Sequence, residues 1–127
     1  MSEKKIIFTE NAPRPVGPYS QGVVSGNFVF VSGQIPIDPK TVQIVTGGIE
    51  QQTIQVLENI KSILESLQLG MSDIVKTSIF LSYFADFKSF NSVYSRCFEN
   101  NPPARTTVQA GLMPNVLVEI DAIAKKS

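Results

Sequence analysis

The sequence of 127 residues contains no histidine and only one cysteine, Cys97. Histidine is the commonest general base and a frequent metal ligand, so its absence excludes a Ser/His/Asp triad and every histidine-based metal site. A single cysteine excludes an internal disulfide and a CxxC site. Cys97 falls inside an apolar helical pattern, which predicts a buried and unreactive thiol.

The chain also lacks an excess of charge and a long apolar run. Its 11 basic and 11 acidic residues cancel and are scattered. Binding to nucleic acid usually requires a basic surface, so this composition argues against it. The first five residues, Met1 to Lys5, lack the apolar core of a signal peptide, and no apolar run is long enough to cross a bilayer. These features predict a cytoplasmic protein, with an organelle left open.

What is present fits a single globular domain over residues 1–127. Hydrophobic residues make up 43% of the chain and charged residues 17%. This balance is typical of a folded domain with one core rather than of a disordered chain. Low net charge combined with this much apolar surface also indicates an oligomer.

Two segments carry apolar residues at helical spacing. The first helix is predicted over residues 49–69, with Gly70 as its C-terminal stop. The second is predicted over about residues 86–98, with Asp86 as its N-cap. The apolar face of the first helix comprises Thr53, Val56, Leu57, Ile60, Ile63, Leu64 and Leu67.

Strands are predicted on both sides of these helices, at residues 4–8, 27–31, 74–81, 105–109 and 116–124, with a further short one at 43–45. This order predicts an α+β fold in which one mixed sheet carries both helices on one face. Phe28, Phe30 and Phe80 lie in the strands, so the opposite face also needs a cover, which self-association would provide.

The C-terminal third places a guanidinium and a carboxylate on its two strands. Pro102 and Pro103 make the chain stiff immediately before Arg105, whose planar fork can bind a carboxylate or phosphate through two hydrogen bonds. Glu119 interrupts an otherwise apolar strand, so it must be paired, exposed at an edge, or functional. The pair predicts acid–base chemistry on a small anion, and a structural ion pair between the two residues remains the alternative. Asp121, two residues further on, is interpreted as a solvated charge rather than a second acid.

Several short motifs resemble the RidA/YjgF family, in the family's order and over essentially the whole chain. They are Gly17-Pro18-Tyr19-Ser20-Gln21, Phe30-Val31-Ser32-Gly33-Gln34-Ile35-Pro36, Leu57-Glu58-Asn59-Ile60, Asn91-Ser92-Val93-Tyr94, Pro102-Pro103-Ala104-Arg105 and Val118-Glu119-Ile120-Asp121-Ala122. The resemblance implies a chorismate-mutase-like α+β fold, assembled as a homotrimer with three clefts between neighbouring subunits. It also implies hydrolysis of reactive enamines and imines (2-aminoacrylate, 2-iminopropanoate, 2-iminobutanoate) to 2-keto acids and ammonia, with no cofactor or metal.

The resemblance assigns a role to each site residue. Arg105 would hold the substrate carboxylate and Glu119 would activate the attacking water. Tyr19 would close over the ligand, although its position also suits an aromatic that packs a turn. The remaining positions would line the cleft: Ser32, Gly33 and Asn91 as polar groups, and Phe87, otherwise a typical core residue, as an apolar wall. The family often has cysteine at position 107, where this chain has Thr107, so the hydroxyl would contact the ligand and thiol-based redox regulation is not expected.

Two other functions remain open. The first is an endoribonuclease that inhibits translation, an activity ascribed to some relatives, which requires a basic groove with aromatic stacking platforms. The second is a non-catalytic binder of small 2-keto carboxylates, which needs Arg105 but not Glu119. The presence of Glu119 favours catalysis.

Overall fold

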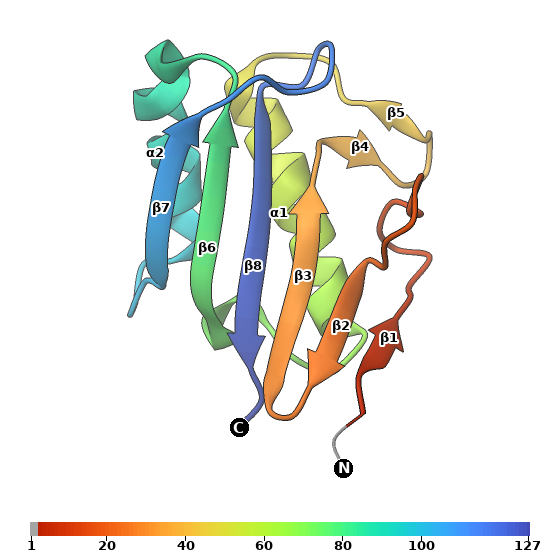
Figure 1. Ribbon diagram of the computed structural model, residues 1–127. Coiled ribbons are helices and arrows are strands. Elements are labelled where there is room, and N and C mark those ends of the chain that lie inside the picture. The colour runs from red at the N-terminus through yellow and green to blue at the C-terminus, as the bar shows by residue number, and fades with distance from the viewer. Residues whose placement is uncertain (1–2) are drawn as a thin grey trace.

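A six-stranded mixed sheet with two helices on one side forms the fold, in the computed structural model, which describes residues 3–127 (Figure 1). The strands are β1 (Lys5–Ile7), β2 (Gly22–Ser25), β3 (Phe28–Gln34), β6 (Ile74–Leu81), β7 (Ala104–Gln109) and β8 (Val118–Lys125), with a separate two-stranded ribbon of β4 (Ile37–Asp38) and β5 (Gln43–Ile44). The helices are α1 (Ile49–Glu65) and α2 (Phe87–Cys97). The predicted α+β class is confirmed.

The strand order in the sheet is β1-β2-β3-β8-β6-β7. All neighbours are antiparallel except β6 and β7, which are parallel and are connected by a crossover that contains α2. The last strand of the chain, β8, therefore lies in the middle of the sheet, between β3 and β6. This order places Glu119 on a central strand and Arg105 on the edge strand β7.

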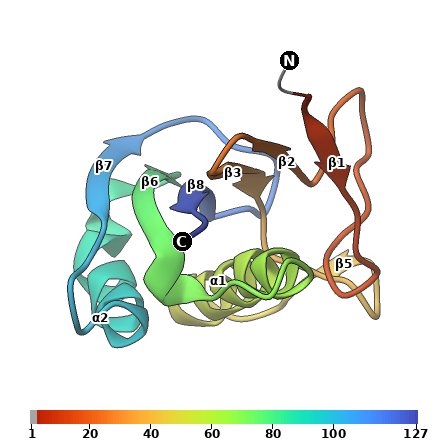
Figure 2. The same cartoon turned by 90° about the horizontal axis from the view of Figure 1, so that it is seen from below.

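Both helices cover the same face of the sheet, as Figure 2 shows along the strand direction. The core lies between them and this face, where apolar residues recur every second position on the strands and at helical spacing on α1. The fully buried side chains include Val29, Val56, Ile60, Ile63, Leu64, Ile79, Leu81, Phe90, Val118 and Ile120. The predicted arrangement of the helices is confirmed.

The predicted bounds of the second helix are confirmed to within one residue at each end, and the predicted end of the first helix is wrong. Helix α1 ends at Glu65, before the predicted Leu69. Gly70 does not stop it but starts a 3₁₀ turn, and its N–H donates to Asp73 Oδ2 at 2.8 Å. Asp86 is the N-cap residue of α2, as predicted, but its side chain makes no capping hydrogen bond; a 3₁₀ turn (Phe84–Asp86) leads directly into the helix.

The strand predictions erred where a turn or bulge changed the alternation. Strand β2 was not predicted, although it forms a hairpin with β3 through Gly26, whose φ of 61° favours glycine. Val75 stands at the same alternate spacing as the buried Thr77, Ile79 and Leu81 but is exposed, because the register between β6 and β8 shifts between Ile74 and Lys76. Strand β8 begins at Val118, two residues later than predicted.

Cys97 is exposed, so the predicted buried thiol is wrong. It is the last residue of α2, and the apolar stripe there continues to Phe98 instead. Partial desolvation, with a smaller contribution from Glu58, nevertheless raises the pKa of the Cys97 thiol. A raised pKa lowers the thiolate fraction, which agrees with an unreactive group.

The face of the sheet that the helices leave open carries large apolar side chains. Phe28, Phe30, Val75 and Val108 are each more than 40% exposed there. Among the described residues, no helix has the length and apolar character needed to span a bilayer.

Candidate active site

Arg105 points from β7 toward α2, on the helix-covered face of the sheet. Its Nη1 donates a hydrogen bond to Asn91 Oδ1 at 2.8 Å. Its guanidinium carbon lies 5.0 Å from the ring centroid of Tyr94 and 5.7 Å from that of Phe87. Cation–π attraction and one hydrogen bond therefore orient the guanidinium. Within residues 3–127 its other N–H donors have no protein acceptor, so they are available to an anion.

The aromatic residues beneath Arg105 form a layer on α2. Tyr94 and Phe90 are buried, and the Tyr94 hydroxyl lies 2.7 Å from Thr77 Oγ1, with which it shares a hydrogen bond. Phe87 is half-buried and stacks on Phe84 with ring centroids 5.1 Å apart. Sequence reasoning assigned Phe87 a role as a wall and missed Phe90 as a support for Arg105. The spacing of positions 87, 90 and 94 along one helix face was the available signal.

Thr107 lies two residues beyond Arg105 on the same face of β7. Its Oγ1 is buried and has no hydrogen-bond partner among the described residues. A buried hydroxyl without a partner carries a desolvation cost, and native proteins seldom retain one unless water or a ligand completes it. Asn91, Arg105 and Thr107 therefore form one polar group with open hydrogen-bonding capacity, which we call the Arg105 half-site.

Glu119 belongs to a second group, on the open face of the sheet. It lines a hollow with a volume of about 390 Å³ together with Val16, Tyr19, Ser32, Gly33, Ile35 and Met113. We call this hollow the Glu119 half-site. Three of the predicted site residues, Tyr19, Ser32 and Gly33, are thus brought together with Glu119. The apolar lining residues Val16, Ile35 and Met113 were not predicted, because they stand in irregular segments without periodicity.

A β-bulge shapes the Glu119 half-site. Val31 pairs with Ala122 and Gln34 with Ile120, so Ser32 and Gly33 together stand opposite the single residue Asp121. A Cβ added to Gly33 would overlap the Glu119 carboxylate, and only glycine gives the carboxylate this space. The Ser32 hydroxyl donates to the Ser20 carbonyl at 2.6 Å and ties the bulge to the preceding loop.

Tyr19 lies at the rim of the Glu119 half-site and is 49% exposed. Its hydroxyl oxygen accepts a hydrogen bond from the Val16 N–H at 3.3 Å, so the ring closes the turn formed by residues 16–19. Tyr19 therefore packs a turn, as one prediction had it, and also lines the hollow that contains Glu119; its closure over a ligand stays a prediction.

The environment of Glu119 favours its protonated form. Burial is the first cause of its raised pKa, and the like charge of Asp121 is the second. Asp121 thus lies on the same face and affects Glu119 electrostatically. A carboxyl group with a raised pKa holds and releases a proton closer to neutral pH than an ordinary glutamate, as general acid–base catalysis requires.

The two half-sites do not meet within one chain. In the register of the sheet, Arg105 on β7 lies opposite Thr77 on β6, which faces the helices. Glu119 on β8 lies opposite Phe80 on β6, which faces away from them. Side chains on adjacent residues of a strand alternate between faces, so the guanidinium and the carboxylate lie on opposite sides of the sheet. The alternative of an Arg105–Glu119 ion pair is wrong for the single chain: the one ion pair within residues 3–127 joins Arg14 and Glu10. Over the same residues, no cluster of three His, Cys, Asp or Glu could hold a metal ion.

Comparisons with known proteins are consistent over the whole chain. A family model described as Endoribonuclease L-PSP matches residues 9–126. A RutC family protein of Saccharolobus solfataricus is 54% identical and covers 98% of this chain and 99% of its own. A Dermatophagoides farinae protein named 2-iminobutanoate/2-iminopropanoate deaminase is 44% identical, with 97% of each chain covered. The crystal structure of E. coli TdcF with bound serine is 41% identical, has a TM-score of 0.91 and covers 97% of this chain and 99% of its own. The chain therefore belongs to the RidA/YjgF/RutC family, whose model carries the description Endoribonuclease L-PSP.

Proposed function

We propose that this protein hydrolyses enamine and imine intermediates such as 2-aminoacrylate, 2-iminopropanoate and 2-iminobutanoate to 2-keto acids and ammonia. The observation that carries the proposal is the division of the site into two complementary half-sites. One offers an oriented guanidinium with free donors, and the other a carboxyl group with a raised pKa in a largely apolar hollow. An imino acid presents a carboxylate and an electrophilic carbon, and needs both groups.

The site is completed between subunits of a homotrimer. The open sheet face that carries Glu119 also exposes Phe28, Phe30 and Val108, and large apolar side chains on an open sheet face suit an interface between subunits. In a cyclic trimer each interface joins two different surfaces, so Arg105 of one subunit and Glu119 of the next can meet in each of three equivalent clefts.

Binding starts with the substrate carboxylate on Arg105. Two parallel N–H···O bonds fix its orientation, and Thr107 Oγ1 supplies a further hydrogen bond near the carboxylate. Asn91 and the aromatic layer hold the guanidinium in place, so little conformational entropy is lost on binding. Tyr19 closes the cleft from the neighbouring subunit.

Hydrolysis needs one activated water. Glu119 accepts a proton from this water while the oxygen attacks the C2 carbon of the protonated imine, which gives a carbinolamine. Glu119 then returns the proton to nitrogen, and it takes up the proton of the carbinolamine hydroxyl as the C–N bond breaks and the carbonyl forms. Ammonia leaves and accepts this last proton as ammonium, which restores the Glu119 carboxylate. The sum is R–C(=NH₂⁺)–COO⁻ plus H₂O giving R–CO–COO⁻ plus NH₄⁺. An enamine first gains a proton at C3 to become the imine.

The named relatives support this chemistry. The Dermatophagoides farinae relative carries the deaminase name, and E. coli TdcF was crystallised with serine, an amino acid with a small side chain and a carboxylate. Both align over nearly the full chain, so the half-sites of this protein fall inside the aligned region.

A coupled assay tests the proposal. A pyridoxal-phosphate-dependent threonine or serine dehydratase releases the imine, and semicarbazide traps what is not hydrolysed. Wild type should suppress the semicarbazone and accelerate release of the keto acid. Arg105→Ala should lower kcat/KM about 10- to 100-fold, and Glu119→Gln about 10²- to 10⁴-fold. Exposed residues of the same types, Arg96→Ala and Glu58→Gln, serve as matched controls. A wild type without effect on either readout refutes the proposal, and carboxylate binding through Arg105 becomes the leading account.

The family description names endoribonuclease as a second candidate. Cleavage of RNA would need cationic groups along a strand-binding groove, and here 11 acidic residues balance 11 basic ones. Incubation of a labelled single-stranded RNA with wild type and Glu119→Gln distinguishes the two: cleavage that survives Glu119→Gln would indicate a separate activity.

A further inference from the structure

The β7–β8 loop (residues 110–117) connects the two strands that carry Arg105 and Glu119. It contains a turn in which the Val116 N–H donates to the Met113 carbonyl at 3.0 Å. Pro114 occupies the second position of this turn and Asn115, with φ of 67°, the third, which is the pattern of a type II turn. The loop is thus irregular but has a defined local geometry.

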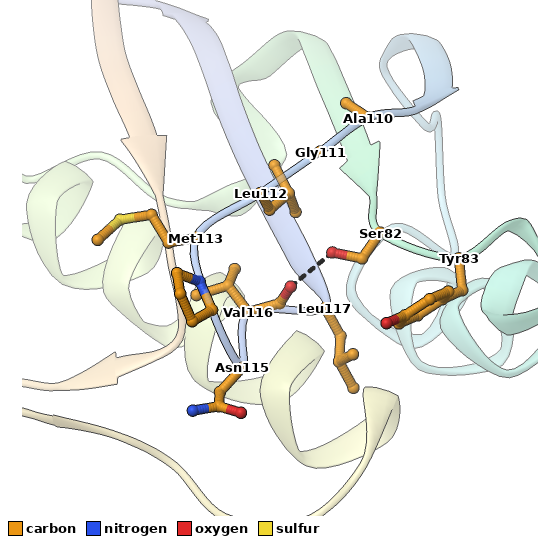
Figure 3. A pocket seen from close by; sticks show the side chains of 10 residues that line it. Ser82, Tyr83, Ala110, Gly111, Leu112, Met113, Asn115, Val116 and Leu117 are labelled. Atoms are coloured by element: carbon orange, nitrogen blue, oxygen red, sulfur yellow. Dashed lines mark hydrogen bonds between the residues drawn. The ribbon is translucent and has the colours of Figure 1, made fainter.

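Hollows border the β7–β8 loop, in which Val116 is buried and Leu117 packs against the core. One hollow of about 370 Å³ lies between the loop and Ser82 and Tyr83 (Figure 3). Another of about 440 Å³ lies on the side of Gln52 and residues 44–47. The third is the Glu119 half-site, to which the loop contributes Met113.

Two polar side chains also hold the end of the β7–β8 loop. Gln52 of α1 is 3% exposed; its Nε2 donates to the Asn115 carbonyl at 2.8 Å and its Oε1 accepts from the Leu117 N–H at 2.7 Å. Ser82 donates through its hydroxyl to the Val116 carbonyl at 2.6 Å and through its N–H to the Leu117 carbonyl at 3.0 Å, the first of which is drawn in Figure 3. Every backbone carbonyl from Asn115 to Leu117 therefore has a partner.

The two hydrogen bonds of Gln52, which we call the amide clamp, hold the backbone next to two residues that line the Glu119 half-site, Met113 and Glu119. Glu119 follows Leu117 by two residues on β8, and Met113 begins the turn that Gln52 holds. In Figure 3 Met113 extends from the loop toward β3, the strand that contributes Ser32 and Gly33 to the same hollow. Met113 is 58% exposed and its unbranched side chain is flexible, so its position depends on the backbone that carries it.

We infer that Gln52 is a positioning residue, which holds at Asn115 and Leu117 the turn that Met113 begins, and that Met113 determines how large a substrate side chain the Glu119 half-site accepts. The inference rests on the proposed hydrolysis of imino acids. The carboxylate and the imine carbon are held by Arg105 and Glu119, which leaves the substituent on C2 to lie along the apolar wall. Met113 is the wall residue on the β7–β8 loop, and without the amide clamp this loop loses two of its hydrogen bonds.

The test compares two imines that differ only in the substituent on C2, a methyl and an isobutyl group, both generated from the amino acids by an amino-acid oxidase. Met113→Ala should raise the ratio of kcat/KM for the isobutyl over the methyl substrate by about tenfold. Gln52→Leu should lower kcat/KM on the methyl substrate by about 10- to 100-fold and shift the ratio in the same direction. A purely structural role would lower both activities together and leave the ratio unchanged.

Thr53→Val is the matched control for Gln52→Leu. Thr53 is the next residue of α1 and is fully buried, but its hydroxyl bonds only Ile49 of its own helix. It should leave the ratio unchanged. If Gln52→Leu does not fold, Gln52→Glu keeps the acceptor for Leu117 N–H, loses the donor to Asn115, and should shift the ratio in the same way.

The outcomes separate the inference from the proposed function. A wild type that hydrolyses neither imine refutes the function itself. If the wild type is active, and the ratio of kcat/KM for the isobutyl over the methyl substrate in both Met113→Ala and the Gln52 variant equals the wild-type ratio, the inference alone is overturned.

Discussion

Arg105 and Glu119 lie on opposite faces of the same sheet, two strands apart. Thr77, the neighbour of Arg105 on β6, is buried beneath the helices, whereas Phe80, the neighbour of Glu119 on the same strand, faces away from them. Two strand spacings alone separate them by roughly 10 Å, and the sheet itself lies between the side chains. A single chain therefore holds both functional groups and cannot bring them to one substrate.

Mixing two inactive variants should restore activity. Arg105→Ala subunits retain Glu119, and Glu119→Gln subunits retain Arg105, so a cleft between one of each contains both groups. If equal amounts are unfolded and refolded together, about one quarter of the wild-type activity per subunit is expected, because about three quarters of random trimers contain both variants and each then has one complete cleft in three.

Each variant refolded alone is the control for this mixture and should show only its own residual activity, below that of the mixture. Sedimentation or size-exclusion chromatography with light scattering should give a trimer in all three samples. An inactive mixture of well-formed mixed trimers would contradict a site shared between subunits.

The acid limb of the pH–rate profile should move when Asp121 is neutralised. Protonated Glu119 cannot accept a proton from water, so kcat/KM is present above the pKa of Glu119 and falls as the pH decreases through it. Burial and the Asp121 carboxylate both raise this pKa. Asp121→Asn removes the second cause, lowers the pKa of Glu119, and shifts the acid limb to lower pH.

Profiles of kcat/KM over the acid range measure the effect for wild type and Asp121→Asn. Asp73→Asn, on the 3₁₀ turn before β6, is a carboxylate remote from the site and should leave the limb in place. A limb that moves to higher pH, or does not move in Asp121→Asn, would show that Asp121 does not act on the catalytic group.

From the sequence, the helices, most strands and several of the residues that line the Glu119 half-site could be predicted. Which face of the sheet each of these residues lies on could not be predicted. Apolar spacing is enough to locate α1, β6 and the core-facing side of the sheet, because burial recurs with the period of each element. The motifs also identified Tyr19, Ser32, Gly33 and Glu119, which the structure brings into one hollow.

What the sequence could not provide was the register between strands far apart in the chain. The face on which Glu119 lies follows from its pairing with Phe80 and from the bulge at Ser32 and Gly33, and neither is encoded locally. The supporting residue Gln52 contacts a loop that follows it by more than 60 positions, so no short motif includes both. Cys97 was misplaced because it lies at the end of α2, where one residue decides between core and solvent.

Gly33→Ala should abolish most activity while the protein stays folded. The new methyl group would overlap the Glu119 carboxylate, which must rotate away from its position beside the bulge. In the proposed mechanism this is the position from which the carboxylate activates water. A misplaced catalytic group costs about 10²-fold in kcat. Thermal unfolding and steady-state kinetics measure the two effects separately.

Gly70→Ala is the control for this substitution, because nothing lies within 4 Å of a Cβ at Gly70 and its φ of −137° suits any residue. It should retain wild-type activity. Full activity in Gly33→Ala would mean that the carboxylate works from another position than the one beside the bulge.

Two identical substitutions, Thr107→Val and Thr77→Val, should change stability in opposite directions. The Thr107 hydroxyl is buried without a partner, so its replacement by a methyl group removes a desolvation cost and should raise the free energy of unfolding of the ligand-free protein by about 1 kcal/mol. The Thr77 hydroxyl shares a hydrogen bond with Tyr94, so Thr77→Val leaves a buried phenol unpaired and should lower the free energy of unfolding by about 1–3 kcal/mol.

Thr107→Val should also raise KM for the imine about tenfold, because the ligand loses a hydrogen bond worth about 1.5 kcal/mol. Thr107→Ser keeps the hydroxyl and should therefore have the wild-type KM. Denaturant unfolding and the coupled imine assay measure both quantities. A destabilised Thr107→Val with unchanged KM would assign the hydroxyl to the fold rather than to the ligand.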